Sequence, residues 1–466
     1  MEEIYRFRSI ENLLGKYKEL ENQEIYFAAP EELNDPIEGF REVYWQGDII
    51  VWKKFFKNYI TQLESSLFQC FPLKPDDQPR INLDFSYSID ELPEDRTSIL
   101  EKIYDFFFQI DIINEFIDCL KNNRKISKNE LAIFLSDLHF PILQIIANEY
   151  EKLDIKFFTR KIYDLQNIQL TFTSAWFKNI DDLIAQNGIE TSSSIIEIIT
   201  QRNRDLNLID KLNHNGLDQI QYFLLQEFPI FFLEQISSLI YPKWYTACFM
   251  TSFSNSSIWG TYGNNHKGIC LIYKISNEED SYFLNLKYPI GKSSKGLIIE
   301  SNKIKLYPIH YDKSPVKINF FKSIGRLPVD KLLKNWYMDN GLVSSVSGHL
   351  NNKDDWHREF WENFIHSVTV KTPDWQHENE YRAIENELVI NYSEPNLRKF
   401  KYDFNDLKGV IFGINTSEQD KISIIKVIYS KCVEYQHKDF KFYQAYFCHK
   451  DKCIKRYEIT DLKFKF

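Results

Sequence analysis

The stretch WQHENEYRAI at residues 375–384 combines two carboxylates and a guanidinium with an apolar end. Side chains alternate between the two faces of an extended strand, so Glu378, Glu380 and Arg382 are predicted to share one face. An arginine flanked by acids on a solvated strand is usually ordinary surface pairing. The stretch therefore predicts either a surface ion cluster or a functional site, and motifs elsewhere in the sequence are needed to decide between these two interpretations.

The composition is that of a densely packed globular protein, with 37 Phe, 27 Tyr and 9 Trp but only 15 Gly and 15 Pro. At 466 residues the chain is too long for one core of ordinary size, so we expect two domains or one heavily elaborated domain. The net charge of −9 argues against a broad basic surface for nucleic acid and is compatible with a local basic groove.

The seven cysteines show no regular spacing, which predicts reduced thiols rather than a disulfide framework. Cys448, His449 and Cys453 lie close together but have no second pair, so we predict no metal site. The N-terminal MEEIYRFRSI lacks an apolar signal core, and we see no apolar run as long as a membrane span. We therefore expect a cytoplasmic protein that does not use a membrane.

The pattern of the chain changes twice, at about residues 49 and 243. Residues 1–48 contain short strand-like runs around a helical segment, and residues 49–243 carry apolar side chains at helical spacing. Residues 244–466 return to short aromatic and β-branched runs separated by turn residues. We predict one α/β domain built from 1–48 and 244–466, with the mainly helical block 49–243 inserted into it.

Four motifs follow one another along the chain: IYRFRS (4–9), LNDPIEGF (33–40), CFMTSFSNSSIWGTYGNNHKGICLIY (248–273) and WQHENEYRAI (375–384), the last followed by LKGVIFGI (407–414). Their order resembles the bacterial domain of unknown function 2971 family. The resemblance covers 1–48 and 244–460 and leaves the helical block unmatched. The family name carries no established reaction.

The order of Arg, Ser and Glu-x-Glu motifs is also similar to that of ADP-ribosyltransferases. This resemblance implies an α+β fold, an ADP-ribosyltransferase-like split β-sheet domain, here with a large helical insertion. It implies NAD as substrate, Arg6 or Arg8 on its phosphate or ribose, and Ser252 and Ser254 at the nicotinamide. It also implies Glu380 as catalytic carboxylate, with Glu378 activating the acceptor. The segment Ser252-Phe253-Ser254 departs from the family pattern, which often has Thr in the middle.

The proposed chemistry explains these residue types. Cleavage of the nicotinamide–ribose bond develops positive charge on the sugar, which an ionised Glu380 stabilises in the transition state. A guanidinium such as Arg6 or Arg8 binds a pyrophosphate through two parallel hydrogen bonds. The alternatives are a salt-bridged edge strand for the two arginines and a turn cap for Ser252 and Ser254.

The loop after Ser254 offers three more candidate binding residues. Trp259 and Tyr262 are expected to stack on a flat ring or to anchor the loop to the core. His266 is expected to contact the adenine or act as a base, or to be a solvated loop residue.

Two functions compete with NAD consumption. One is a non-catalytic module that senses a nucleotide or a partner. The other is a nuclease with magnesium held by Asp35, Glu38, Glu378 and Glu380. Our leading prediction is an ADP-ribosyltransferase or NAD glycohydrolase that acts as a bacterial toxin or antiviral defence effector. Its acceptor would be water, protein or nucleic acid, and the helical block would bind a regulatory partner.

Overall fold

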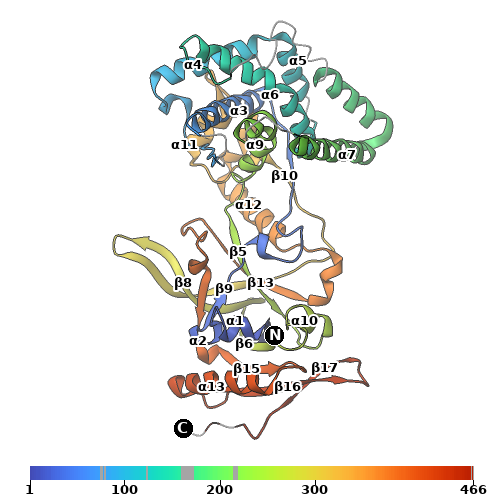
Figure 1. Cartoon of the computed structure of the whole chain (residues 1–466), viewed down its shortest axis with the longest axis vertical. Helices are drawn as coiled ribbons and strands as arrows, with labels where there is room; N and C mark the ends of the chain where they lie inside the picture. The colour runs from blue at the N-terminus through green and yellow to red at the C-terminus, as the bar shows by residue number, and fades with distance from the viewer. Residues whose placement is uncertain are drawn as a thin grey trace. The chain divides into compact units, whose positions relative to one another are not determined.

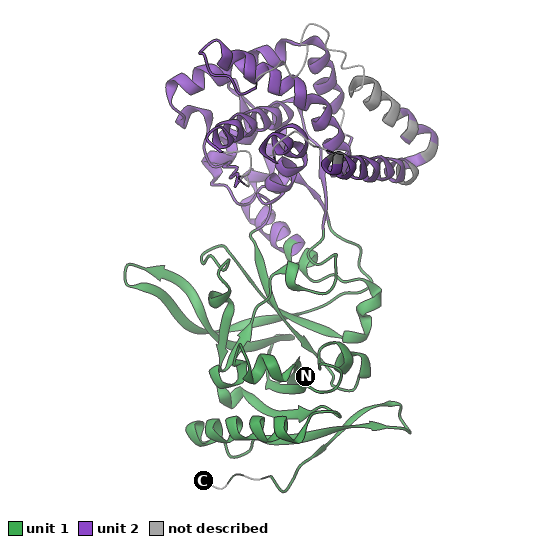
Figure 2. Cartoon of the chain, viewed as in Figure 1, with its two compact units in different colours: residues 1–40, 242–316, 364–466 green, residues 41–241, 317–363 purple. Residues whose placement is uncertain are grey.

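The computed structural model describes residues 1–73, 77, 80–121, 124–158, 173–213, 219–462 and 464. The chain forms two compact units (Figure 2). Unit 1 comprises residues 1–40, 242–316 and 364–466, and unit 2 comprises residues 41–241 and 317–363. Unit 2 thus receives two separate segments of chain, whereas the sequence-based boundaries kept 317–363 together with the rest of 244–466.

Unit 1 is built on a sheet to which the described residues contribute twelve strands. Its order is β17-β16-β15-β6-β1-β5-β13-β9-β8-β14-β2, with β7 paired to β8. The bounds are β1 (Glu3–Arg8), β2 (Glu24–Tyr26), β5 (Trp244–Met250), β6 (Ile269–Lys274), β7 (Ser276–Glu278), β8 (Ser281–Ser293), β9 (Gly296–Pro308), β13 (Glu380–Asn386), β14 (Lys399–Tyr402), β15 (Leu407–Phe412), β16 (Lys441–Cys448) and β17 (Cys453–Glu458). With the helices of both units, the chain is a mixed α+β protein, as predicted.

The three strands that carry or border the predicted motifs are neighbours in this sheet. β5 pairs with β13 over its full length, from Glu380 opposite Met250 to Asn386 opposite Trp244. β1 pairs with β6 along its whole length but with β5 only at Tyr5. The edges of β1 and β5 therefore separate after one residue pair.

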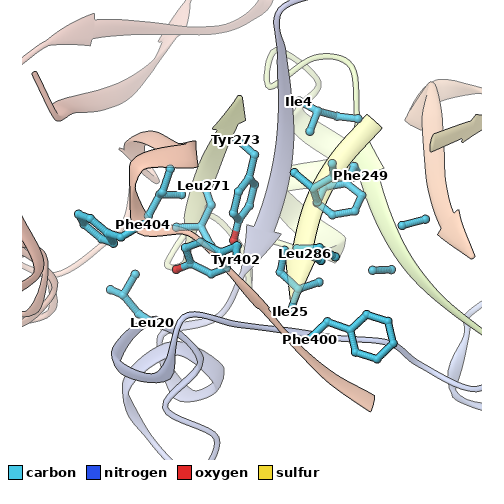
Figure 3. Close-up of a cluster of buried hydrophobic side chains, with 14 of the residues drawn as sticks. Ile4, Leu20, Ile25, Phe249, Leu271, Tyr273, Leu286, Phe400, Tyr402 and Phe404 are labelled. Carbon is cyan, nitrogen blue, oxygen red and sulfur yellow. The ribbon is translucent and has the colours of Figure 1, made fainter. Parts of the chain in front are cut away.

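Alternation along the strands gives the sheet two apolar faces. One face buries a large cluster that includes Ile4, Phe249, Leu271 and Tyr273 (Figure 3). The other buries a smaller cluster around Trp259. Because both faces are covered, the side chains of the central strands are held in fixed positions by packing on each side.

Short helices and one long helix complete unit 1 (Figure 1). They are α1 (Ile10–Leu14), α2 (Glu19–Asn22), α10 (Ser256–Thr261) and α13 (Glu418–Tyr435), with 3-10 turns at Pro30–Glu32, Pro373–Glu378, Pro395–Arg398 and Phe404–Asp406. The Ser9 and Asn255 side chains cap α1 and α10, and Ser417 caps α13, each by accepting from backbone amides of the first turn.

Unit 2 is mainly helical. Its α-helices are α3 (Ile49–Cys70), α4 (Glu94–Gln109), α5 (Asp111–Leu120), α6 (Lys128–Glu151), α7 (Thr173–Asn213), α8 (Gln219–Tyr222), α9 (Phe228–Ser237) and α11 (Val329–Leu332). Its 3-10 turns are Ile89–Glu91, Phe320–Lys322 and Ser345–Asn351, and its π turns are Phe223–Glu227 and Leu333–Tyr337. Two small sheets join β10 (Lys317–Asn319), β3 (Glu42–Trp45) and β4 (Ile126–Ser127), and β11 (Met338–Asp339) with β12 (Leu342–Val343). The division between the units falls within α12 (Lys353–Val368).

Two helices show how the sequence builds unit 2. In α3, Trp52, Phe55, Phe56 and Tyr59 recur at helical spacing and are completely buried. α6 is long and apolar enough to cross a membrane by length and composition, contrary to the expectation that the chain has no such run. However, 72% of its most apolar window is buried inside the protein, so α6 serves here as a core helix.

Candidate functional site

Arg382 lies at the centre of a buried ion network at the start of β13. Its Nε donates to Glu380 Oε1 at 2.8 Å, and its Nη2 donates to Glu38 Oε1 at 2.7 Å. Its Nη1 also donates to the Val368 carbonyl at 3.0 Å. The Arg382 side chain is 0% exposed, so this is a core arrangement and not surface pairing.

Lys371 joins a second pair of contacts to this network. Its Nζ lies 2.7 Å from Glu378 Oε2 and 3.0 Å from Glu380 Oε2. The hydroxyl of Tyr262 donates to Glu378 Oε1 at 2.6 Å. The three carboxylates of Glu38, Glu378 and Glu380 therefore share only two cations, which leaves one surplus negative charge in a nearly dry site.

The alternation predicted for this stretch holds for only part of it. Glu380 and Arg382 lie on the same side of β13, but Glu378 ends a 3-10 turn (Pro373–Glu378) before the strand begins. Asn379, with φ 44°, takes the left-handed conformation between them. Glu378 and Glu380 nevertheless converge, because both accept from Lys371.

The shared cations shift the pKa values of the carboxylates in opposite directions. Burial alone would raise the pKa of Glu380, but the charges of Arg382 and Lys371 outweigh it and lower that pKa to about 2. For Glu38 and Glu378, burial outweighs the neighbouring cations and raises the pKa. At neutral pH Glu380 is thus the firmly ionised member of the network.

The two arginines of β1 lie on the same strand but differ in their partners. Arg8 makes an ion pair with Glu19 of α2, with its Nε 2.7 Å from the carboxylate. Arg6 is 7% exposed, and its Nη2 donates to the Tyr26 carbonyl at 3.1 Å. Arg6 Nη1 is buried and has no hydrogen-bond partner among the described residues.

A cavity of about 190 Å³ opens where β1 and β5 separate. Its lining in unit 1 brings together Arg6, Arg8, Cys248, Tyr262 and Lys371. Glu32, Asn34 and Glu38 also line it, from the segment that follows β2. Glu378 and Glu380 are not part of this lining and lie behind Lys371, to which both are bonded.

Several predicted binding residues lie elsewhere in unit 1. Ser252 and Ser254 bond to each other, with 2.8 Å between their hydroxyl oxygens, and do not line the cavity. Trp259 is completely buried against Phe7 and donates to the Phe253 carbonyl. His266 lies parallel to Trp259 in the loop that follows, outside the cavity lining. These placements correspond to the turn-cap reading of the serines and the anchoring reading of Trp259.

The sequence analysis missed two residues that hold the network together. Lys371 was not singled out, and Glu38 was considered only as a contact for a substrate group or a cation. Lys371 stands in the VKTPDW run ahead of the Glu-x-Glu motif, so a basic residue just before an acidic pair was the available signal. Glu38 is 344 positions from Arg382, and no local pattern connects them.

The carboxylates named for the nuclease alternative are engaged in other interactions. Asp35 Oδ2 accepts from the Thr372 backbone at 3.2 Å, and Glu38, Glu378 and Glu380 pair with Arg382 or Lys371. Within the described parts of the chain, no group of three or more His, Cys, Asp or Glu side chains could hold a metal ion. No observation therefore favours the nuclease alternative.

Residues 258–383 match the model of a family described as a protein of unknown function (DUF2971). The chain carries a DUF2971 segment. The matched residues include Tyr262, Lys371, Glu378, Glu380 and Arg382, so most of the ion network falls inside the DUF2971 match, whereas β1 falls outside it. Neither the curated proteins nor the solved structures include a match to the chain.

Proposed function

We propose that unit 1 binds NAD and breaks the bond between nicotinamide and ribose. The electron pair of that bond passes to the ring nitrogen and neutralises its positive charge. An acceptor oxygen or nitrogen then bonds to the ribose carbon and loses a proton. The products are nicotinamide and either ADP-ribose, when water is the acceptor, or an ADP-ribosylated macromolecule.

The observation that carries the proposal is the unpaired Arg6 Nη1 beside a cavity bordered by the motif strands. A buried guanidinium nitrogen without a hydrogen-bond acceptor is costly even though the charge of Glu19 partly offsets that of Arg6, and a bound anion would remove that cost. The pyrophosphate of NAD offers such an anion and matches the geometry of a guanidinium. Support also comes from the adjacency of β1, β5 and β13 in the sheet. The strand register, however, directs the Arg6 side chain to the face of Ile4 and the Glu380 side chain to the face of Met250.

The size of the cavity decides which part of NAD it would accept. Its volume of about 190 Å³ lies below the roughly 300–1,000 Å³ of ordinary ligand pockets, so it would hold only part of a dinucleotide. We assign the pyrophosphate to the Arg6 end. Lys371 separates this cavity from Glu380, so the ribose would reach the carboxylate only after the Lys371 ammonium moves aside.

The occupied oxygens of Glu380 favour a second candidate, nucleotide binding without cleavage. Both oxygens already accept from Arg382, and one also accepts from Lys371. In this alternative the network fixes the shape of a sensor, and its carboxylates never contact the ligand.

One experiment separates the two candidates. Purified protein is incubated with labelled NAD, and free nicotinamide and label on protein, DNA or RNA are measured for wild type, Arg6→Gln and Glu380→Gln. Cleavage that is lost in both variants supports the enzyme. NAD binding by calorimetry that is lost only in Arg6→Gln, with no nicotinamide released by wild type, supports the sensor.

Both variants are expected to fold, and this can be checked by circular dichroism. Glu380→Gln leaves two carboxylates facing two cations, and Arg6→Gln removes an unpaired charge. Lys441→Gln, which loses an exposed pair with Glu458 in the same unit, is the control. If wild type neither binds nor cleaves NAD, both candidates for this nucleotide are wrong.

A further inference from the structure

The β8–β9 hairpin of unit 1 extends beyond the strands that flank it (Figure 1). On one side, β14 pairs with β8 only at Leu286 and Lys287. On the other side, β13 pairs with β9 only from Leu306 to Pro308. Past these points the hairpin continues as two strands, to which no further strand of the described chain is paired.

The end of this hairpin is apolar on both of its faces. Leu297, Ile298 and Ile299 are 42%, 40% and 51% exposed. Because successive side chains of a strand point to opposite faces, Leu297 and Ile299 lie on one face and Ile298 on the other. A protein partner that docks on one face would leave the other apolar face in water, whereas a lipid phase can surround both.

The same tip carries an excess of positive charge. Residues 287–300 contain Lys287, Lys292 and Lys295, with Glu300 as the one acidic residue. Lys292 and Lys295 are exposed; Lys292 precedes the turn between Ser293 and Gly296, and Lys295 lies in it. Lysines beside exposed aliphatic side chains match a surface that is anionic outside and apolar underneath, as that of a membrane with anionic lipids is.

We propose that the tip of the β8–β9 hairpin binds the surface of membranes that contain anionic lipids. Leu297, Ile298 and Ile299 enter the boundary between headgroups and acyl chains, and Lys292 and Lys295 contact the headgroups. This binding is reversible and needs no membrane-spanning segment, which is why a search of the sequence for spans does not detect it. The proposal is independent of any activity at the β1–β5 cavity.

The test is co-sedimentation of the full chain with vesicles of phosphatidylcholine alone or mixed with phosphatidylserine. We expect pelleting with the mixed vesicles only and a decrease as salt is added. At about 1 kcal/mol for each lysine near the surface, the pair Lys292→Gln and Lys295→Gln weakens binding roughly 25-fold. The pair Ile298→Ser and Ile299→Ser abolishes pelleting at the same lipid concentration.

The matched control is the pair Leu388→Ser and Val389→Ser. These two aliphatic residues of unit 1 are 58% and 73% exposed and stand in a run of sequence without lysine, NELVINYSEP (386–395), so pelleting stays at the wild-type level. Equal pelleting of wild type and the Ile298/Ile299 variant, or none by wild type, overturns the proposal. A dimer in vesicle-free buffer that the same substitutions dissociate would show instead that the tip binds a second copy.

Discussion

Replacement of Arg382 by Gln tests whether the β13 network is a buried set of charges that depend on one another. The substitution removes the guanidinium that bonds to Glu38, Glu380 and the Val368 carbonyl. Lys371 then remains as the single cation against three carboxylates, with its Nζ 3.7 Å from Glu38 and 3.0 Å from Glu380. The side chains of Glu38 and Glu380 are 3% and 1% exposed, so both carboxylates stay largely out of bulk water when the partner is lost.

The expected loss is large and depends on pH. Removing one partner of a buried ion pair typically lowers the free energy of unfolding by about 3–5 kcal/mol, and we expect that range at pH 7. In the variant, Glu38 and Glu380 hold protons more tightly when folded than when unfolded, so its stability rises as the pH falls towards 4.5. The difference between wild type and variant therefore shrinks between pH 7 and pH 4.5.

In wild type, the contribution of Glu380 to the free energy of unfolding changes with pH in the opposite direction. The pKa of Glu380 is about 2 in the folded state against an ordinary value of 4.5. Its contribution to stability is therefore complete above pH 4.5 and is lost as the pH falls from 4.5 towards 2. The raised pKa values of Glu38 and Glu378 act the other way, because the folded state binds their protons more tightly.

Hydrogen exchange of peptides from β13, followed by mass spectrometry over a denaturant series, reports on unit 1 without contributions from unit 2. Lys441→Gln serves as the control, since its pair with Glu458 is exposed and should contribute at most about 1 kcal/mol. A loss below about 1 kcal/mol for Arg382→Gln would refute the idea of mutually dependent buried charges. An equal loss at pH 4.5 and pH 7 would also refute it.

Three further substitutions in unit 1 are tested by the same exchange measurement. Tyr262→Phe removes the donor to Glu378 and should lower the free energy of unfolding by about 1–3 kcal/mol at pH 7. The loss should be smaller at acidic pH, where Glu378 is protonated. No loss at either pH would show that this hydrogen bond does not contribute to stability. Gly413→Ala would place a Cβ 2.2 Å from the His266 carbonyl oxygen and should cost about 1–3 kcal/mol. Gly260→Ala, with nothing within 4 Å of its Cβ and a helical position in α10, should be neutral or stabilising, and equal effects of the two glycine substitutions would contradict the packing argument.

Local sequence patterns predicted well those features that lie within a single strand or helix. The aromatic stripe of α3 is buried as its spacing requires, and IYRFR forms β1 at Glu3–Arg8. The order of the motifs also anticipated that β1 and β13 would lie near each other. Such predictions succeed because periodicity of two or 3.6 residues is a property of each element alone.

The partners of the buried charges could not be predicted in this way. Glu38 and Arg382 meet only because β13 pairs with β5 while the segment after β2 reaches the same strand through Ala28 and Thr246. The break before β13 at Asn379 also moves Glu378 out of the alternation that the sequence suggested. Both features depend on long-range strand register, which a single sequence does not reveal.

The two arginines of β1 show why the completed structure points to a ligand where the sequence offered two equal candidates. Arg6 and Arg8 have the same chemistry and lie two residues apart on β1, so alternation puts both on one face of the strand. Glu19 compensates Arg8, whereas Arg6 gives one bond to the Tyr26 carbonyl and lies 5.5 Å from the Phe249 ring centre. Burial and the nearby charge of Arg8 lower the pKa of Arg6, so keeping the Arg6 guanidinium charged in the folded protein costs free energy. An anion in the adjoining cavity would remove that cost for Arg6. Arg8 lines the same cavity but is already paired with Glu19, so ligand binding should depend on Arg6 more than on Arg8.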